Sequence, residues 1–144
     1  MKEKIISSTL ILGAFIFVAA CATSLDQHKS KSVDEAAVIK VIMEHERTWN
    51  DHDASGFLAT LHDDAKIELG CKGQLLSKTE FADQLPLLMS DYPTVKLVNP
   101  IADVSGKEAV VKVTATRLGD ENHIFRLAML KQNNHWYITR ETCY

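Results

Sequence analysis

The hydrophobic pattern of the chain changes its period near residue 94, and this change constrains the fold more than any other feature. Before residue 94, apolar residues recur at helical spacing. After it they alternate with polar residues along four predicted strands, at about 94–104, 108–118, 122–132 and 135–142. Turn sequences separate these strands: Ser105-Gly106, Gly119-Asp120 and Asn133-Asn134. Helices followed by such a meander predict an α+β domain in which helices cover one face of a curved, mostly antiparallel sheet.

Capping signatures predict where the helices begin. Ser32-Val-Asp-Glu35 is a capping box ahead of apolar residues at helical spacing, and it predicts a helix over about 33–50. Asp53 predicts the N-cap of a second, short helix, which His62-Asp63-Asp64 should end before a strand at 65–70. Ser77-Lys-Thr-Glu80 is a second capping box, for a helix that Pro86 should kink or split.

Residues 1–20 combine a basic start with an apolar run of signal-peptide length, which is short for a transmembrane helix. The run ends in Val18-Ala19-Ala20-Cys21, which resembles the lipobox of bacterial lipoproteins. An ordinary small-residue cleavage site with a chance cysteine is the alternative. The resemblance implies a diacylglycerol and a further acyl chain on Cys21, enough to anchor a protein stably to a membrane. Because Ala22 rather than an aspartate follows Cys21, the pattern resembles that of lipoproteins exported to the outer membrane. We expect the domain to lie on the periplasmic face of that membrane.

The remaining chain is expected to form one folded domain over 33–144. Residues 21–32, with the lipidated Cys21, are rich in Ser, Thr, Lys and Gln and predict a flexible tether without a fold. The 144 residues include 16 basic and 19 acidic side chains, a formal charge of −3. This balance provides no basic surface for nucleic acid. The expected partners are a membrane, through Cys21, a small-molecule ligand and a second copy of the chain.

Cys71 and Cys143 remain once Cys21 is lipidated, and an even pair in an exported protein predicts a disulfide. Such a bond would close a loop of about 73 residues and remove roughly 4.4 kcal/mol of unfolded-state entropy. Two buried thiols are the alternative, because the sequence does not give the distance between their Cα atoms. A redox-active pair is less favoured, since no Cys-x-x-Cys motif is present.

Three stretches between residues 49 and 67 resemble a known superfamily. They are Trp49-Asn50-Asp51-His52-Asp53, Phe57-Leu58 and Leu61-His62-Asp63-Asp64-Ala65-Lys66-Ile67. They resemble the opening of nuclear transport factor 2-like proteins, which include SnoaL-like and ketosteroid-isomerase-like members, and the predicted element order agrees. The resemblance implies a cone-shaped fold with a pocket in its mouth and frequent homodimerisation through the sheet. It does not imply one activity, because the fold hosts isomerases, dehydratases, hydrolases and binding modules. At matching positions the ketosteroid isomerase general base falls on Leu69, and its tyrosine donor falls on His45.

Alternation along the last two strands predicts which side chains face the helices. If the register permits, one face holds Phe125, Leu127, Met129, Trp136, Ile138 and Arg140. The opposite face, for solvent or a dimer interface, holds Arg126, Leu130, Tyr137, Thr139 and Glu141. The first face predicts an apolar ligand pocket with few polar groups, lined by Trp49, Phe57, Phe81, His123, Phe125, Met129, Trp136 and Arg140. Ordinary core packing is the alternative for each aromatic residue. Arg140 on this face would need an anionic partner, such as Glu68, an Asp or a ligand carboxylate.

The candidate catalytic residues are His45, Asp53 and Asp64. An Asp at a helix start is more often an N-cap, and a pair such as Asp63-Asp64 is more often solvated than catalytic. The histidines at 45, 52 and 62 lack metal-ligand spacing, so we expect no metal and no other cofactor.

These patterns together predict an envelope lipoprotein whose pocketed domain binds a small, partly apolar molecule or a protein partner without catalysis. One alternative is a SnoaL-like hydrolase, dehydratase or isomerase that uses His45 or an Asp, with Arg140 orienting an anionic substrate. The other is a dimeric interaction module whose sheet binds a partner and whose cavity is filled by core side chains.

Overall fold

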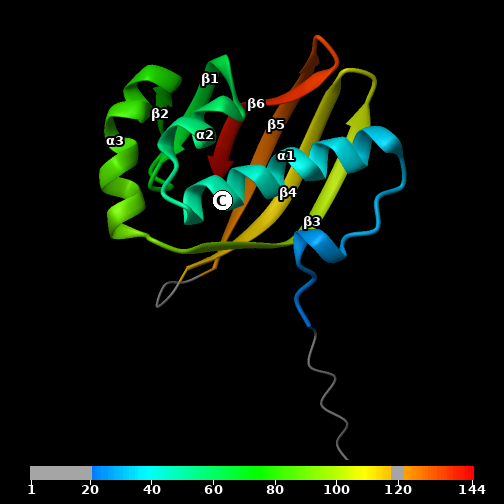
Figure 1. Ribbon diagram of the computed structural model, residues 1–144, viewed down its shortest axis with the longest axis horizontal. Coiled ribbons are helices and arrows are strands. Elements are labelled where there is room, and N and C mark those ends of the chain that lie inside the picture. Colours follow the sequence, from blue (N-terminus) through cyan, green and yellow to red (C-terminus); the bar gives the residue numbers. More distant parts are fainter. Residues whose placement is uncertain (1–20, 118–121) are drawn as a thin grey trace, which may run out of the picture.

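Three helices pack on the concave face of a curved six-stranded sheet in the computed structural model of the protein, which describes residues 21–117 and 122–144 (Figure 1). The strands are β1 Leu61–Leu69, β2 Gln74–Ser77, β3 Val95–Ser105, β4 Glu108–Arg117, β5 His123–Gln132 and β6 His135–Cys143. Their order across the sheet is β2-β1-β6-β5-β4-β3, and all neighbours are antiparallel except β1 and β6. The predicted α+β class is therefore confirmed. The predicted signal peptide and the Gly119-Asp120 turn lie outside the described residues.

The helices are α1 Val33–Asn50, α2 Ala54–Ala59 and α3 Lys78–Asp91, preceded by a short 3-10 turn, η1, at Leu25–Gln27. Helix α1 begins where its cap predicts, because the backbone N–H of Glu35 donates to Ser32 Oγ at 3.0 Å. The Glu35 side chain does not complete the predicted box. Its carboxylate accepts instead from the backbone of Lys31 at 3.1 Å and from His28 Nε2 at 2.7 Å.

The other two helices also begin at their predicted caps. Asp53 Oδ1 accepts from the backbone of Gly56 at 2.9 Å at the start of α2. Ser77 and Glu80 form the complete capping box of α3. Pro86 does not split α3, which continues as one helix to Asp91. Because Pro86 is exposed, water can replace the backbone hydrogen bond that proline removes.

Strand β1 starts earlier than predicted. His62-Asp63-Asp64 lies inside the strand instead of ending the preceding helix. Leu61 is 1% exposed and pairs with Ile138 of β6, whose backbone N–H donates to Thr60 at 2.9 Å. Burial of this leucine and its pairing outweigh the turn tendency of two consecutive aspartates.

The N-terminal segment is folded where a tether was expected. Thr23 and Asn99 exchange two hydrogen bonds, from Thr23 N to Asn99 Oδ1 at 2.8 Å and from Asn99 N to Thr23 O at 2.7 Å. Asn99 lies at a bulge in β3 with φ of 54°. Leu25, the one large apolar residue of this stretch, is 3% exposed and joins the core. The expectation of a structureless segment is wrong from Thr23 to His28, because burying Leu25 orders the residues around it.

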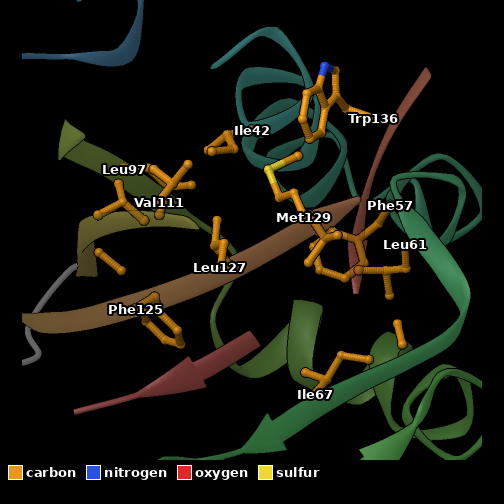
Figure 2. Close-up of a cluster of buried hydrophobic side chains, with 14 of the residues drawn as sticks. Ile42, Phe57, Leu61, Ile67, Leu97, Val111, Phe125, Leu127, Met129 and Trp136 are labelled. Atoms are coloured by element: carbon orange, nitrogen blue, oxygen red, sulfur yellow. The ribbon is translucent and has the colours of Figure 1, made fainter. Parts of the chain in front are cut away.

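The core lies between the helices and the concave face of the sheet, with side chains from all three α-helices, from η1 and from all six strands; Figure 2 shows part of it. Its most deeply buried large residues are Ile42, Leu61, Ile67, Leu85, Leu127, Trp136 and Ile138. The structure joins Cys71 to Cys143 in a disulfide with Cα atoms 5.1 Å apart, in agreement with the predicted pair. Among the described residues, no helix is long and apolar enough to cross a membrane.

Acid should weaken the attachment of the N-terminal segment through Glu35. The hydrogen bond from His28 holds the pKa of this carboxyl below its usual range, against the opposing effect of burial, and the Lys31 N–H assists. Because the pKa of Glu35 is lower in the folded state than in the unfolded state, its ionised carboxyl group stabilises the fold. This contribution is complete above the unfolded-state pKa of about 4.3 and is lost as the pH falls through the folded-state pKa. Urea unfolding from pH 6 to pH 3 should show this loss in the wild type.

The Glu35→Gln variant should be less stable than the wild type by about 1 kcal/mol at pH 6, with a difference that shrinks toward pH 3. Glu108→Gln, at an exposed carboxylate of β4, is the control and should keep the wild-type slope. Equal slopes for Glu35→Gln and the wild type would contradict the role of the His28–Glu35 pair.

Candidate functional site

A small cavity lies on the concave side of the sheet, between the C-terminal half of α1, α2 and strands β3 to β6. Its volume is about 50 Å³, enough for a few water molecules. It is lined by His45, Glu46, Trp49, Phe57, Val95, Leu97, Val113, Ala115, Phe125, Leu127 and Glu141. The walls are therefore mostly apolar, with one imidazole and two carboxyl groups.

His45 projects from α1 and is 6% exposed. Its ring packs on Phe57 with ring centroids 3.9 Å apart, and its Nδ1 lies 2.6 Å from Thr60 Oγ1. The hydroxyl of Thr60 has one hydrogen, which it donates to the backbone carbonyl of Phe57 at 2.7 Å. Thr60 therefore accepts from His45, and Nδ1 carries the proton.

Glu141 approaches the other nitrogen of the same imidazole. Its side chain is 17% exposed, and Oε2 lies 3.3 Å from His45 Nε2. Because Nδ1 already donates to Thr60, a hydrogen bond between Nε2 and Oε2 requires one further proton, on either the imidazole or the carboxyl group. The pair therefore offers a position for one proton inside a mostly apolar cavity, where it can accept a hydrogen bond from a bound group and, once protonated, donate one.

A β-bulge in β6 places Glu141 in the cavity. Met129 pairs with Ile138, but the next residue of β5, Ala128, pairs with Arg140, so Thr139 is the extra residue. Its hydroxyl donates to the backbone of Ala128 at 3.1 Å, which supports the bulge. Glu141 then pairs with Leu127 on the concave side.

The bulge overturns two expectations. Arg140 was predicted to line the pocket and Glu141 to face away from it. Arg140 is instead exposed, and Glu141 lines the cavity. Strict alternation cannot reveal an inserted residue, although a one-residue shift after Ile138 would have placed Glu141 in phase with Trp136.

The remaining predicted pocket residues divide into two groups. Trp49, Phe57 and Phe125 line the cavity. The others lie elsewhere: Phe81, Met129 and Trp136 are buried in the core, and His123 lies beside the disulfide at the start of β5. For these three apolar residues, ordinary core packing describes the structure better than ligand contact.

The structure does not bring the candidate aspartates into the cavity. Asp53 is exposed and caps α2, and the Asp64 side chain is 96% exposed on β1. Of the three catalytic candidates, only His45 lines the cavity. Glu141, its partner, was missed because the sequence analysis assigned it to the opposite face.

Polar side chains near the rim of the cavity already have hydrogen-bond partners within the fold. Trp49 Nε1 donates to the carbonyl of Tyr92 at 2.7 Å. Asn50 and Val95 exchange two hydrogen bonds, at 2.8 and 2.9 Å, which fasten the end of α1 to the start of β3. Glu46 accepts from the backbone of Leu97 and lies 3.5 Å from Lys96. The His45–Glu141 pair is therefore the polar feature of the lining that remains available to a ligand.

A larger open groove, about 840 Å³ in volume, runs along the outer side of α1. Its walls include surface charges that pair with one another, such as Arg47 with Glu44 at 2.6 Å. The groove does not contain the His45–Glu141 pair. It is the solvated side of an amphipathic helix, and we assign no site to it.

The helices, the curved sheet and the hollow at its mouth define the nuclear transport factor 2-like class of cone folds, to which solved structures show close similarity. A nuclear transport factor 2-like protein from Shewanella baltica superposes with a TM-score of 0.67 at 12% identity, over 81% of this chain and 97% of that one. A candidate ketosteroid isomerase from Shewanella frigidimarina superposes with a TM-score of 0.66 at 19% identity, over 75% of this chain and 94% of that one. A candidate scytalone dehydratase from Novosphingobium aromaticivorans superposes with a TM-score of 0.63 at 13% identity, over 77% of this chain and 83% of that one. No family model matches the sequence, and no curated protein does. The similarity establishes the fold.

Two neighbouring substitutions test the bulge. Glu141→Ala should destabilise the domain by about 1–3 kcal/mol, because His45 loses a partner in a buried site. Arg140→Ala, at an exposed residue, should change the unfolding free energy by less than about 0.5 kcal/mol. Urea unfolding at pH 7 measures both, and the reverse order of effects would show that the register described here is wrong.

Proposed function

We propose that the domain binds a small, neutral, partly apolar molecule in the cavity and that the His45–Glu141 pair recognises its polar group. The observation that carries the proposal is the contact between His45 and Glu141 in a mostly apolar hollow. Ligand sites commonly combine apolar walls with a few placed polar groups in this way. The pair can both donate and accept, which suits a hydroxyl or carbonyl group.

The charged groups that line the cavity favour a neutral ligand over an anionic one. The cavity is lined by two carboxyl groups and one imidazole, and Arg140 lies outside it. Because none of the described lining residues is a lysine or arginine, an anionic ligand would lack a counter-charge there. We therefore propose a neutral ligand in place of the anionic molecule that Arg140 in the pocket would have favoured.

The size of the cavity limits the ligand as well. With about 50 Å³ available, only a molecule of a few heavy atoms fits without movement of the walls. A larger ring would require the half-buried Trp49 side chain at the rim to turn, with loss of its hydrogen bond to the carbonyl of Tyr92. Two structural neighbours bear the names of enzymes that act on small molecules, a ketosteroid isomerase and a scytalone dehydratase. Their names support a small-molecule ligand.

We propose binding without catalysis because the described lining contains a single acid–base pair. Glu46, the other carboxylate, is occupied by the backbone of Leu97 and by Lys96. Leu69, the residue at the ketosteroid isomerase base position, packs against the core and has no titratable group.

Binding of 4-fluorophenol, a small ring with one hydroxyl group, tests the proposal. Its ¹⁹F resonance should shift and broaden on titration with the wild-type domain. Ala115→Leu adds a larger side chain to the cavity wall and should weaken binding at least about tenfold. Ala128→Leu, on the opposite face of the same sheet, should leave binding unchanged.

A native mass spectrum of the domain isolated without refolding complements the titration by detecting a co-purified molecule. Binding that Ala115→Leu does not weaken would place the ligand outside the cavity. Absence of both probe binding and a co-purified ligand would favour the filled-core alternative.

We also propose that the protein is a lipoprotein anchored through Cys21 to the outer membrane, with its domain on the periplasmic side. The support is the Val18-Ala19-Ala20-Cys21 sequence, followed by Ala22. Cys21 is exposed and unpaired among the described residues. Only Ala22 separates it from Thr23, which is bound to Asn99. An anchored domain would therefore lie close against the lipid headgroups.

Fractionation of a Gram-negative host that expresses the full chain tests the anchor. The wild type should be recovered with the outer membrane and should incorporate labelled palmitate. Cys21→Ser should incorporate none and leave the outer-membrane fraction. Cys71→Ser is the matched cysteine control and should remain labelled and anchored. Equal labelling of the wild type and Cys21→Ser would exclude the proposed lipidation.

A further inference from the structure

We propose that Cys71, Cys143 and His123 form a metal site when the disulfide is reduced, and that this site takes a d10 cation of the Zn²⁺ type. One ligand atom from each residue lies within 4.8 Å of the other two, and all three residues are half-buried. Two thiolates and an imidazole are preferred zinc ligands, and three protein ligands leave the fourth position for water.

The distances suit a metal ion. Zinc–sulfur bonds of about 2.3 Å and zinc–nitrogen bonds of about 2.0–2.1 Å separate tetrahedral ligand atoms by roughly 3.4–3.8 Å. The imidazole nitrogen therefore needs to move by only about an ångström. The two sulfur atoms must separate from their bonded distance, which rotation of the cysteine side chains provides.

The disulfide is not what holds the ligands together. Cys143 pairs with Phe125 in β5, two residues after His123, and the next residue, Tyr144, donates to the backbone of Ile124 at 2.9 Å. These contacts keep Cys143 beside His123 in the absence of a sulfur–sulfur bond.

Glu68 holds the segment that carries Cys71, the third ligand, close to Cys143. Its Oε2 accepts from the backbone of Cys143 at 3.1 Å, and its Oε1 accepts from Gly73, in the turn that carries Cys71, at 2.7 Å. One carboxylate thus bridges the two cysteine-bearing segments through their backbones. The parallel pairing of Ile67 with Glu141 holds the same two strands side by side.

The local charge also favours a cation. The Glu68 carboxylate lies next to the backbone of both cysteine-bearing segments and adds negative potential to that of two thiolates. A doubly charged cation neutralises the thiolates, which otherwise repel one another at this distance.

Metal binding and the disulfide exclude one another. A dithiol reductant transfers two electrons and two protons to the sulfur–sulfur bond and is itself oxidised to a disulfide. The resulting thiols lose their two protons to solvent when the cation binds. The cation can therefore enter only the reduced protein. The expectation of no metal rested on the spacing of His45, His52 and His62 alone. Cys71, His123 and Cys143 lie far apart in the chain and form no local motif that would reveal them as a set.

Zinc titration tests the proposal on residues 21–144 with Cys21→Ser, which removes the third thiol. This part of the chain contains every core residue that the structure describes. The protein is reduced with dithiothreitol, freed of it under nitrogen and titrated with Zn²⁺ against a chromophoric chelator. We expect one equivalent bound by the reduced protein and none by the oxidised protein. Co²⁺ in place of zinc should give a thiolate-to-metal charge-transfer band.

Variants separate a three-ligand site from adventitious binding. His123→Ala should keep the disulfide and lower the zinc affinity of the reduced protein at least about tenfold. His135→Ala, at an exposed histidine, is the matched control and should have no effect. The double variant Cys71→Ser/Cys143→Ser should bind no zinc tightly. A zinc affinity that His123→Ala leaves unchanged, or tight zinc binding by the double variant, would overturn the proposal.

Circular dichroism accompanies the titration, because reduction removes a cross-link between residues 72 positions apart. If the reduced chain stays folded and binds no zinc, the proposal is wrong. If it unfolds on reduction, zinc must restore the fold for the proposal to stand, because binding to assembled ligands stabilises the folded state.

Discussion

The parallel pairing of β1 with β6 is the interaction on which the cavity and its surroundings depend. It joins the strand that follows the first two helices to the last strand of the chain, in the interior of the sheet (Figure 1). The backbone bond from Ile138 to Thr60 fixes the position of Thr60, whose hydroxyl orients His45. The same pairing holds Glu141 beside Ile67. Parallel strands need a long connection, here provided by α3 and the four strands β2 to β5, so this contact forms only when the whole domain assembles.

Much of the fold could be predicted from the sequence, because its signals are local. Helix caps depend on residues three apart, and strands β3 to β6 follow from alternation and turn residues. The errors have a common origin in contacts between distant segments. Leu61 extends β1 because β6 pairs with it, and Leu25 orders the N-terminal segment because the core buries it. Neither contact leaves a signature within a short stretch of sequence.

The candidate site was predicted less completely than the fold, and one inserted residue accounts for most of the difference. A strand with strict alternation would have placed Arg140 in the cavity, and that charge would have suggested an anionic ligand. With Thr139 bulged out, the residue that faces the cavity is an acid, and the ligand chemistry changes from anionic to neutral. His45 could be found as a candidate because it lies on a helix, where a residue's face is set by its own neighbours.

The polar groups of the cavity divide into those that build it and those that remain available. In an apolar environment each polar atom needs a partner, and the fold supplies one for almost every group here. Thr60 bonds to Phe57 and His45, Glu46 bonds to the start of β3, and Trp49 bonds to Tyr92. The His45–Glu141 contact is longer, at 3.3 Å, and becomes a hydrogen bond only when one of the two groups takes up a further proton. A ligand hydroxyl inserted there could satisfy both groups, whereas at the other positions it would have to break an existing bond. Recognition of a polar group in this cavity is therefore expected at the one pair that the rest of the fold leaves incompletely satisfied.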